Sequence, residues 1–298
     1  MQKKPIGNWN EYALPALIPL LVWLFLQACA SERREGCLDF RYSNFSVGAE
    51  VGCPNCCKPP EVRILLRHRY SLGDSLQPLD LFPRFYLPVG APDSLSLEGL
   101  SYILSDFQLV DWQGRVIPAL DSLTIRKLNS QKDSLLLTFA NSFLVGNPAV
   151  FLNRRVGTIL HNGVAIRSLR FQFGVSSSVN ALQPSDFPAS HPLAPGQGTL
   201  HQAGSGFTFA SMSLKRKSGH LTTSQTLVLN GEASRILVEI PTVLSLRAGY
   251  HQEITLDVNI ASWLGQMDFS QPPEVTKRRW MAGIPGSFRV AAVNERLD

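Results

Sequence analysis

The chain has little of what an enzyme or a nucleic-acid-binding protein requires. Only 17% of its 298 residues are charged, and the net charge is +5. It has no Gly-x-Ser-x-Gly elbow, no His-Glu-x-x-His helix and no phosphate-binding loop, and its carboxylates are too scattered for acid and base roles. Nucleic-acid binding would need a larger basic face with interleaved aromatics. We therefore predict neither class, and expect the basic clusters 215–217 and 277–279 to be solvated.

A long uninterrupted apolar run is also missing. The apolar stretch 13–26 is broken by Pro15 and Pro19 and follows Lys3 and Lys4. A permanent membrane span needs roughly 20 apolar residues to cross about 30 Å of hydrocarbon. A short apolar core behind a basic start is typical of an export signal, which we assign to residues 1–28.

The export signal ends at a cysteine. The sequence Leu26-Gln27-Ala28-Cys29 resembles the bacterial lipobox, in which the cysteine is diacylated and becomes the new N-terminus. Two or more acyl chains hold a protein on a membrane stably. We predict a lipid anchor at Cys29, and the alternative is ordinary cleavage near Ala30. Because residue 30 is not aspartate, the usual signal for inner-membrane retention is absent, which favours an outer-membrane lipoprotein on either its periplasmic or its surface face.

Cysteine is scarce outside one short segment. Besides Cys29, the chain has only Cys37, Cys53, Cys56 and Cys57. An even number of cysteines in a short exported segment predicts disulfides. Since the adjacent Cys56 and Cys57 pair with each other only under strain, each is expected to pair with Cys37 or Cys53. The alternative is a thiolate site for a soft metal. Residues 29–60 are thus predicted to form a Cys-rich module and linker.

Long helical periodicity is absent from residue 61 to the end. Segments rich in β-branched, aromatic and leucine residues recur instead, and many alternate apolar with polar side chains. We therefore predict an all-β domain over 61–298, an antiparallel β-sandwich or barrel. The predicted strands are 62–68, 100–112, 134–144, 165–175, 207–214, 226–229, 235–240 and 253–260.

Local signals refine this prediction. Asn230-Gly231 between two apolar runs favours a hairpin. Only 260–265 and 287–296 favour short helices. The connection 176–206, rich in Pro, Ser and Gly, is long enough to be either functional or disordered. One face of 165–175 is expected to carry Ala165, Arg167, Leu169, Phe171 and Phe173.

Several motifs, in order, resemble those of the methanobactin-associated copper-binding protein (MbnP-like) family, over about residues 61–298. They are Arg67-His68 with Gly73-Asp74 and Pro78-Leu79; Leu100-Ser101-Tyr102 with Ser105-Asp106-Phe107 and Leu109; Leu169-Arg170-Phe171-Gln172-Phe173-Gly174-Val175 with Asn180; His191-Pro192-Leu193 and Gly206-Phe207-Thr208-Phe209; His220 after Ser218-Gly219; and Met281-Ala282-Gly283 to Asn294.

The resemblance implies an exported all-β protein that binds copper(I) through histidines, for copper storage or transfer. In some members a partner dihaem enzyme oxidises a tryptophan to kynurenine. Two or three imidazole or thioether ligands suffice for copper(I). By this resemblance His68 is the best candidate ligand and His220 the second, and His201 would supply a third imidazole. We expect the three rings to meet at one end of the sandwich, with an envelope protein or a redox enzyme as partner.

The chain departs from the family at one motif. His201-Gln202-Ala203 stands where the family has Trp-x-Trp, and Ser176 replaces an aspartate, so the kynurenine chemistry does not transfer. The alternative function is therefore a lipid-anchored β-sandwich that binds an envelope protein or a glycan after loss of its metal site. The remaining candidates are assigned other roles: His191 is expected to be structural before Pro192, Met212 to pack in the core, and His161 and His251 to lie on the surface.

Overall fold

The structure is a computed structural model. It describes residues 33–72, 74–79, 85–86, 94–128, 134–218, 220–265, 267 and 271–297. The predicted export signal and Cys29 lie outside these residues. No helix within the described ranges is long and apolar enough to cross a membrane.

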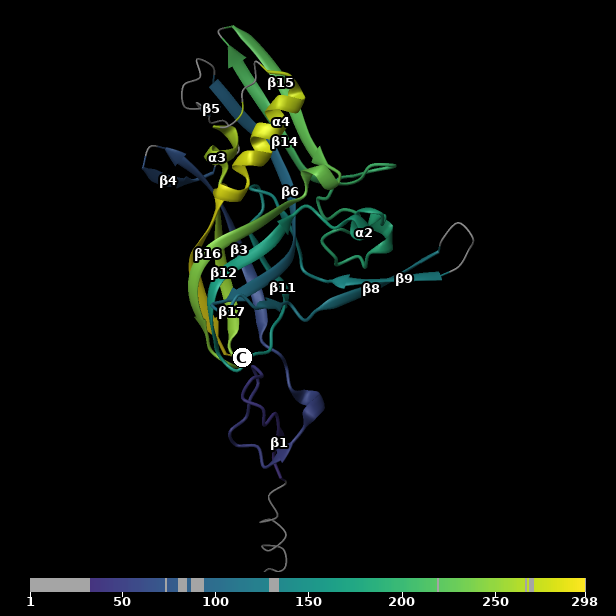
Figure 1. The fold of residues 1–298 in the computed structure, drawn as a ribbon, viewed down its shortest axis with the longest axis vertical. Coiled ribbons are helices and arrows are strands. Elements are labelled where there is room, and N and C mark those ends of the chain that lie inside the picture. Colours follow the sequence, from purple (N-terminus) through teal and green to yellow (C-terminus); the bar gives the residue numbers. More distant parts are fainter. Residues whose placement is uncertain are drawn as a thin grey trace, which may run out of the picture.

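Two β-sheets form the body of the molecule (Figure 1), as predicted for an all-β sandwich. The larger sheet has the order β13 (His201–Gln202), β14 (Gly206–Ser218), β6 (Ser94–Asp111), β12 (Val164–Phe173) and β16 (Ile236–Leu246). Three further strands pair with β6, namely β5 (Phe85–Tyr86), β7 (Val116–Pro118) and β10 (Phe143–Gly146). One further strand, β15 (Leu221–Asn230), pairs with β14. The smaller sheet has the order β11 (Leu152–Thr158), β3 (Glu61–Leu72), β17 (His251–Asn259) and β18 (Phe288–Arg296), with β4 (Ser75–Pro78) on β3.

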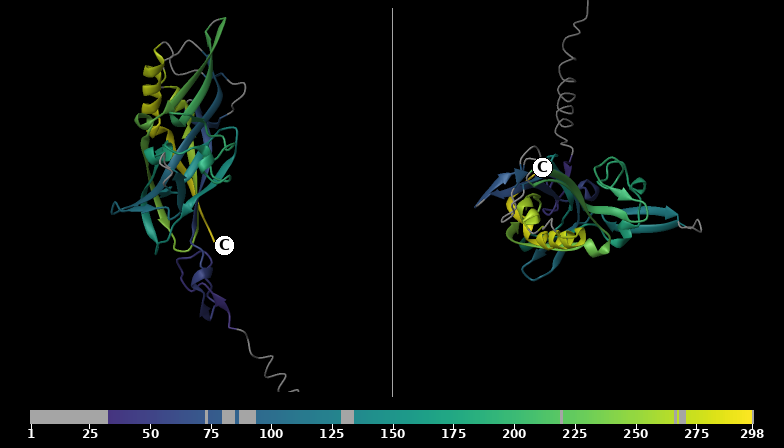
Figure 2. Two further views of the ribbon diagram at one scale, coloured as in Figure 1. Left: turned by 90° about the vertical axis from the view of Figure 1, so that its right-hand side faces the viewer. Right: turned by 90° about the horizontal axis from the view of Figure 1, so that it is seen from above.

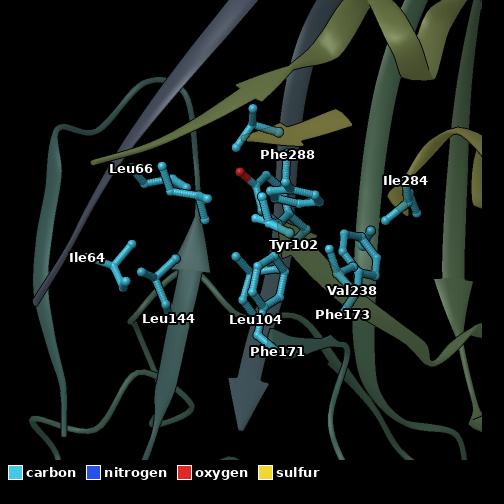
Figure 3. Packing of buried hydrophobic residues seen from close by; sticks show 14 of the residues in the cluster. Ile64, Leu66, Tyr102, Leu104, Leu144, Phe171, Phe173, Val238, Ile284 and Phe288 are labelled. Carbon is cyan, nitrogen blue, oxygen red and sulfur yellow. The ribbon is translucent and has the colours of Figure 1, made fainter. Parts of the chain in front are cut away.

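The main core lies between these sheets, because each contributes an apolar face. Ile64 and Leu66 from β3 meet Leu104 and Phe171 of the larger sheet (Figure 3), and all four are buried. Fully burying one such side chain contributes about 1.5–3 kcal/mol relative to leaving it exposed. Two helices, α3 (Ile260–Leu264) and α4 (Pro273–Gly283), close one part of this core with the buried Trp263 and Trp280.

A second, smaller core lies under the connection 176–206. This connection is ordered and contains α2 (Ser177–Asn180). It also packs against the hairpin of β8 (Ser122–Leu128) and β9 (Ser134–Ala140), which projects from the body (Figure 2). The buried members of this cluster are Ile103, Ile125, Phe143, Val175, Val179, Leu182, Phe187, Leu193, Ala194, Phe207 and Phe209.

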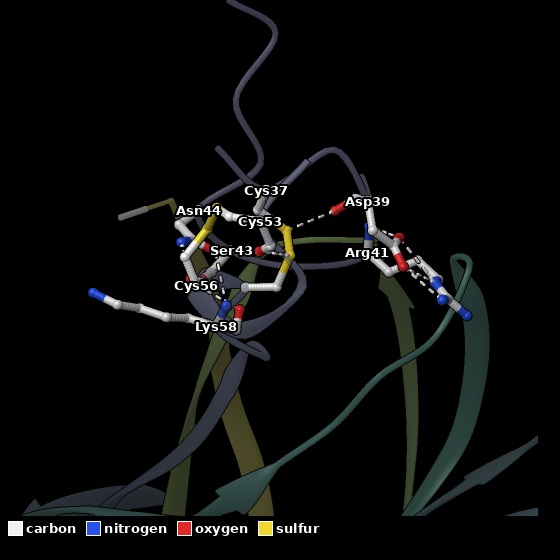
Figure 4. Close-up of a disulfide and its surroundings, with 9 residues drawn as sticks. Cys37, Asp39, Arg41, Ser43, Asn44, Cys53, Cys56 and Lys58 are labelled. Atoms are coloured by element: carbon white, nitrogen blue, oxygen red, sulfur yellow. Dashed lines mark hydrogen bonds and ion pairs between the residues drawn. A yellow bond between two sulfur atoms is a disulfide. The ribbon is translucent and has the colours of Figure 1, made fainter. Parts of the chain in front are cut away.

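The Cys-rich module lies at one end of the sandwich, before β3 (Figure 1). Disulfides join Cys37 to Cys57 and Cys53 to Cys56, with Cα–Cα distances of 5.0 and 5.5 Å. The predicted bridges, with Cys56 and Cys57 in different pairs, are therefore confirmed. Asn44 ties the module together, since its side chain donates to the Cys56 carbonyl and accepts from the Lys58 amide (Figure 4). The module also holds β1 (Glu35–Gly36) and β2 (Val51–Gly52).

Several local predictions are wrong. The smaller sheet is mixed, because β3 and β17, which are distant in sequence, pair in parallel. Asn230-Gly231 does not turn a hairpin, since β15 pairs with β14 and β16 with β12. The segment 134–144 is two strands, broken at Asn141-Ser142. The short helix expected over 260–265 is α3, Ile260–Leu264, whereas most of the segment 287–296, expected to be helical, is the strand β18, Phe288–Arg296.

Candidate metal-binding residues

His68 lies on β3 and faces the inside of the sandwich. Strand periodicity places it on the same face as the buried Val62, Ile64 and Leu66. Its ring is half-buried, and its Nε2 lies 2.8 Å from the hydroxyl oxygen of Tyr102 on β6. Tyr102 is the one hydrogen-bond partner of the ring among the described residues.

Tyr102 is held in one position by its neighbours. It is fully buried, stacks on Phe173 at 5.8 Å and meets the edge of Trp263 at 5.2 Å. Gly146 lies opposite it in the β10–β6 pairing, and a Cβ at Gly146 would collide with the tyrosine ring. The glycine therefore makes room for the phenol that fixes His68.

Burial keeps both partners uncharged. It lowers the pKa of His68 to about 4, so the imidazole is neutral at pH 7, and it raises the pKa of Tyr102. Either the phenol donates to Nε2, or Nε2–H donates to the phenol oxygen. In the second tautomer Nδ1 keeps its lone pair, as in metal-binding histidines whose other ring nitrogen donates to a neighbour.

His201 lies at the edge of the larger sheet. It pairs with Phe207 at the start of β14, and the two rings meet edge to face at 5.0 Å. Its Nε2 is buried and has no hydrogen-bond partner in the described part of the chain. The ring also lines a hollow of about 360 Å³ together with Asn180, Ser205 and Glu232.

His220 lies at the other end of the same strand. It is exposed in the turn that joins β14 to β15, two residues after Ser218. From Phe207 to Ser218 the strand takes 11 steps, which at about 3.3 Å each separates its ends by about 36 Å. His201 and His220 therefore cannot bind one ion together.

The predicted convergence of His68, His201 and His220 is thus wrong. The physical reason is the length of β14, which runs to Ser218 rather than ending near 214 and so moves the His220 turn away from His201 (Figure 1). Consistently, no group of three or more His, Cys, Asp or Glu side chains that could hold a metal occurs among the residues with described positions.

The other candidates have structural surroundings. His191 is structural, as predicted: it is buried, with Nε2 3.1 Å from Asn141 Oδ1, and its Nδ1 accepts from the Leu193 amide. Met212 is fully buried in the core, also as predicted. His251 is not a surface residue: it is 6% exposed, and its Nδ1 accepts from the Glu61 amide at the start of β3.

Sequence reasoning missed the role of Tyr102. Tyr102 was noted in the sequence only as part of the Leu-Ser-Tyr motif. Strand periodicity alone gives no indication that its hydroxyl reaches from β6 to His68 on β3. It also missed Trp263, because α3 is too short to give a clear helical pattern.

Comparisons with known proteins give one family. The family model MbnP matches residues 59–277. The solved structure of MbnP from Methylosinus trichosporium is similar to this chain, with 17% identity, coverage of 72% of this chain and 79% of that one, and a TM-score of 0.37. No curated protein matches.

Proposed function

The chain belongs to the MbnP family, which is methanobactin-associated and copper-related, and from this premise we propose that it is an envelope lipoprotein that binds copper(I) as cargo, for storage or transfer. His68 is the residue that we assign to the metal. The observation that supports this assignment is its partly buried hydrogen bond to Tyr102.

The arrangement around His68 suits copper(I) in two ways. Because the pKa of the ring is about 4, no proton competes for its lone pair at neutral pH. When Nε2–H donates to the Tyr102 hydroxyl, the ring is oriented and Nδ1 keeps its lone pair for a ligand, and this is the tautomer that the proposal requires.

One imidazole is not a complete site. Copper(I) takes two or three soft or imidazole donors, and His201 and His220 lie near opposite ends of β14, which are about 36 Å apart in an extended strand. The contacts of the His68 ring within the described part of the chain are with Tyr102 and include no second imidazole, so we assign the second donor to a partner, such as an envelope protein or a redox enzyme. An incomplete site of this kind suits transfer better than permanent storage.

Competition with a coloured copper(I) chelator under anaerobic conditions tests the proposal. We expect stoichiometric binding by the wild type and by the exposed control His220→Gln, and a loss of affinity of at least about tenfold in His68→Gln. Equal binding by the wild type and His68→Gln would remove His68 from the site.

A second candidate function is favoured by the separation of His201 and His220. In this case the anchored sandwich is an interaction or glycan-binding module whose metal site has been lost. Absence of stoichiometric copper(I) binding by the wild type itself would support this function and count against the first.

The membrane anchor has its own test. We propose that Cys29 carries the lipid, so growth with labelled palmitate should label the wild-type protein, and Cys29→Ala should abolish the label. A labelled Cys29→Ala protein would contradict the lipobox assignment.

A further inference from the structure

A second site lies away from His68, where the connection 176–206 packs beside β10 and β11. A pocket of about 390 Å³ opens there. Ligand pockets commonly measure 300–1,000 Å³. The connection supplies one wall through Ser190 and His191, and β10 and β11 supply Phe143 and Arg154.

Most of the charge in this pocket is already neutralised. Arg155 lies 2.6 Å from Asp121 and 3.5 Å from Glu61, and Arg63 lies 3.3 Å from Glu61. Two carboxylates therefore offset two guanidinium groups.

The guanidinium of Arg154 is not neutralised in this way. Its one hydrogen bond to the described part of the chain goes from Nη2 to the Ser190 carbonyl at 2.8 Å, and no carboxylate described there pairs with it. The side chain is half-buried, and burial lowers the pKa of its guanidinium below the ordinary value without removing the charge. A partly desolvated cation without a counterion is unfavourable, so this charge favours an anion in the pocket.

His191 does not compete for that anion. Both of its ring nitrogens are engaged, by Asn141 and by the Leu193 amide, and its ring stacks on Phe187 at 4.6 Å. Burial, together with the charge of Arg154, lowers its pKa to about 4, so it is neutral at pH 7.

Part of the wall is apolar. Phe143, Leu123, Pro188 and Pro192 line the pocket beside the polar groups. A ligand with an anionic group and a carbon skeleton would thus meet both a guanidinium and an apolar surface.

We propose that this pocket binds a small carboxylate monoanion, held by the fork of Arg154 with its carbon skeleton against Phe143 and the prolines. A guanidinium presents paired N–H donors that match the two oxygens of a carboxylate. One uncompensated positive charge matches one negative charge, which favours a monoanion over a phosphate dianion. An acidic sugar and an acylated amino acid both carry this chemistry. The proposal does not depend on copper.

Two-dimensional NMR titrations of the purified exported chain test it with D-glucuronate and with N-acetylalanine. Their neutral counterparts, D-glucose and N-acetylalaninamide, are the controls. We expect saturable shifts near His191 and Phe143 for at least one carboxylate, with a Kd of about 1 mM or below, and none for its neutral counterpart. Binding of D-glucuronate would indicate an acidic sugar as the ligand, and binding of N-acetylalanine would indicate an acylated amino acid.

Variants then locate the contact. Arg154→Gln should weaken binding at least about tenfold, Arg154→Lys should have an intermediate effect because it keeps the charge and loses the fork, and the exposed control Arg126→Gln should bind as the wild type does. Thermal melting verifies that each variant is folded. The proposal would be overturned if Arg154→Gln bound the carboxylate as tightly as the wild type, or if the wild type bound the neutral counterpart as tightly as the carboxylate. It would also be overturned if neither carboxylate gave a saturable shift on the wild-type chain, a result that does not depend on any variant being folded.

Discussion

The Nε2 of His68 and the hydroxyl oxygen of Tyr102 lie 2.8 Å apart and link the two sheets of the sandwich through their side chains. His68 belongs to β3 in the smaller sheet, and Tyr102 belongs to β6 in the larger one. The hydroxyl points toward the side of the core where Leu66 lies (Figure 3). The candidate ligand is therefore part of the packing that holds the sheets together.

Tyr102→Phe should destabilise the fold although it keeps the ring. The contacts with Phe173 and Trp263 remain, but the Nε2 of His68 loses its partner, which costs about 1–3 kcal/mol when the group is buried. Urea unfolding measures the difference, and Tyr250→Phe on the half-buried ring beside Arg247 serves as control, with an expected change within about 0.5 kcal/mol. Wild-type stability in Tyr102→Phe would mean that the hydrogen bond is not formed in solution.

The protein should lose stability as the pH falls from about 6.5 to about 4. His68 and His191 have a pKa of about 4 when folded, mainly because of burial, against an ordinary value of 6.5. In this window the unfolded chain binds protons that the folded chain does not, so the free energy of unfolding decreases with decreasing pH. For each histidine the loss is on the order of 1–3 kcal/mol.

Urea unfolding at pH 7.5 and pH 4.5 checks this dependence, with His68→Gln for comparison. The variant should show a smaller loss than the wild type between the two pH values, because one of the rings that titrate in this window is gone. Equal losses would show that His68 is not held neutral by burial.

The sequence was sufficient for the fold class but not for the pairing of strands. Alternating segments predicted a sandwich because a half-buried strand has a period of two. In β12 this period changes phase beside a bulge between Ile166 and Ser168: the buried residues are Ile166 and Ser168 first, and then Leu169 and Phe171. The prediction that Ala165 and Arg167 share a face with Leu169 and Phe171 is therefore wrong, since Ala165 and Arg167 are exposed and a bulge adds one residue that periodicity does not reveal.

The candidate site was less accessible to sequence reasoning than the fold. His68 could be singled out from motif order, and it is the one candidate ligand that faces the main core. The distance between His201 and His220 depends on how far β14 extends past Leu214, and Lys215-Arg216-Lys217 gave no apolar signal for this extension. Pairing with β15 continues the strand there instead.

Asp257→Asn should weaken the smaller sheet. The Asp257 side chain is 2% exposed and lies 2.8 Å from Arg67 on β3 and 2.9 Å from Arg289 on β18, so it joins three strands. Burial alone would raise its pKa, but the hydrogen bonds from these arginines outweigh burial and hold the pKa below its ordinary value. Removing the charge should cost about 2 kcal/mol at pH 7, less than for a fully buried pair because the arginines are partly exposed.

The matched control for Asp257→Asn is Glu274→Gln in the exposed pair with Lys277, which should change stability by less than about 0.5 kcal/mol. The difference between Asp257→Asn and the wild type should shrink as the pH falls below about 4, since the unfolded wild-type chain then binds a proton at this carboxylate, whereas the folded chain, whose pKa is lower, binds it only at a lower pH. An Asp257→Asn variant as stable as Glu274→Gln at pH 7 would contradict the role assigned to this carboxylate.

The disulfides of the module should be separable from the stability of the sandwich. The bridge between Cys37 and Cys57 closes a loop with a sequence separation of 20, and a loop of this size contributes about 3 kcal/mol. The main core begins at Val62 and contains no residue of the module. Replacing both Cys37 and Cys57 by serine should therefore expose residues 33–60 to protease and leave the melting temperature of the β-domain unchanged.

A thiol titration tests the bridges themselves. In a Cys29→Ala background, the unfolded and unreduced protein should show no free thiol before reduction and four after it. Four free thiols before reduction would exclude the bridges and restore the thiolate metal site, whereas a large fall in the melting temperature of the double variant would show that module and sandwich fold as one unit.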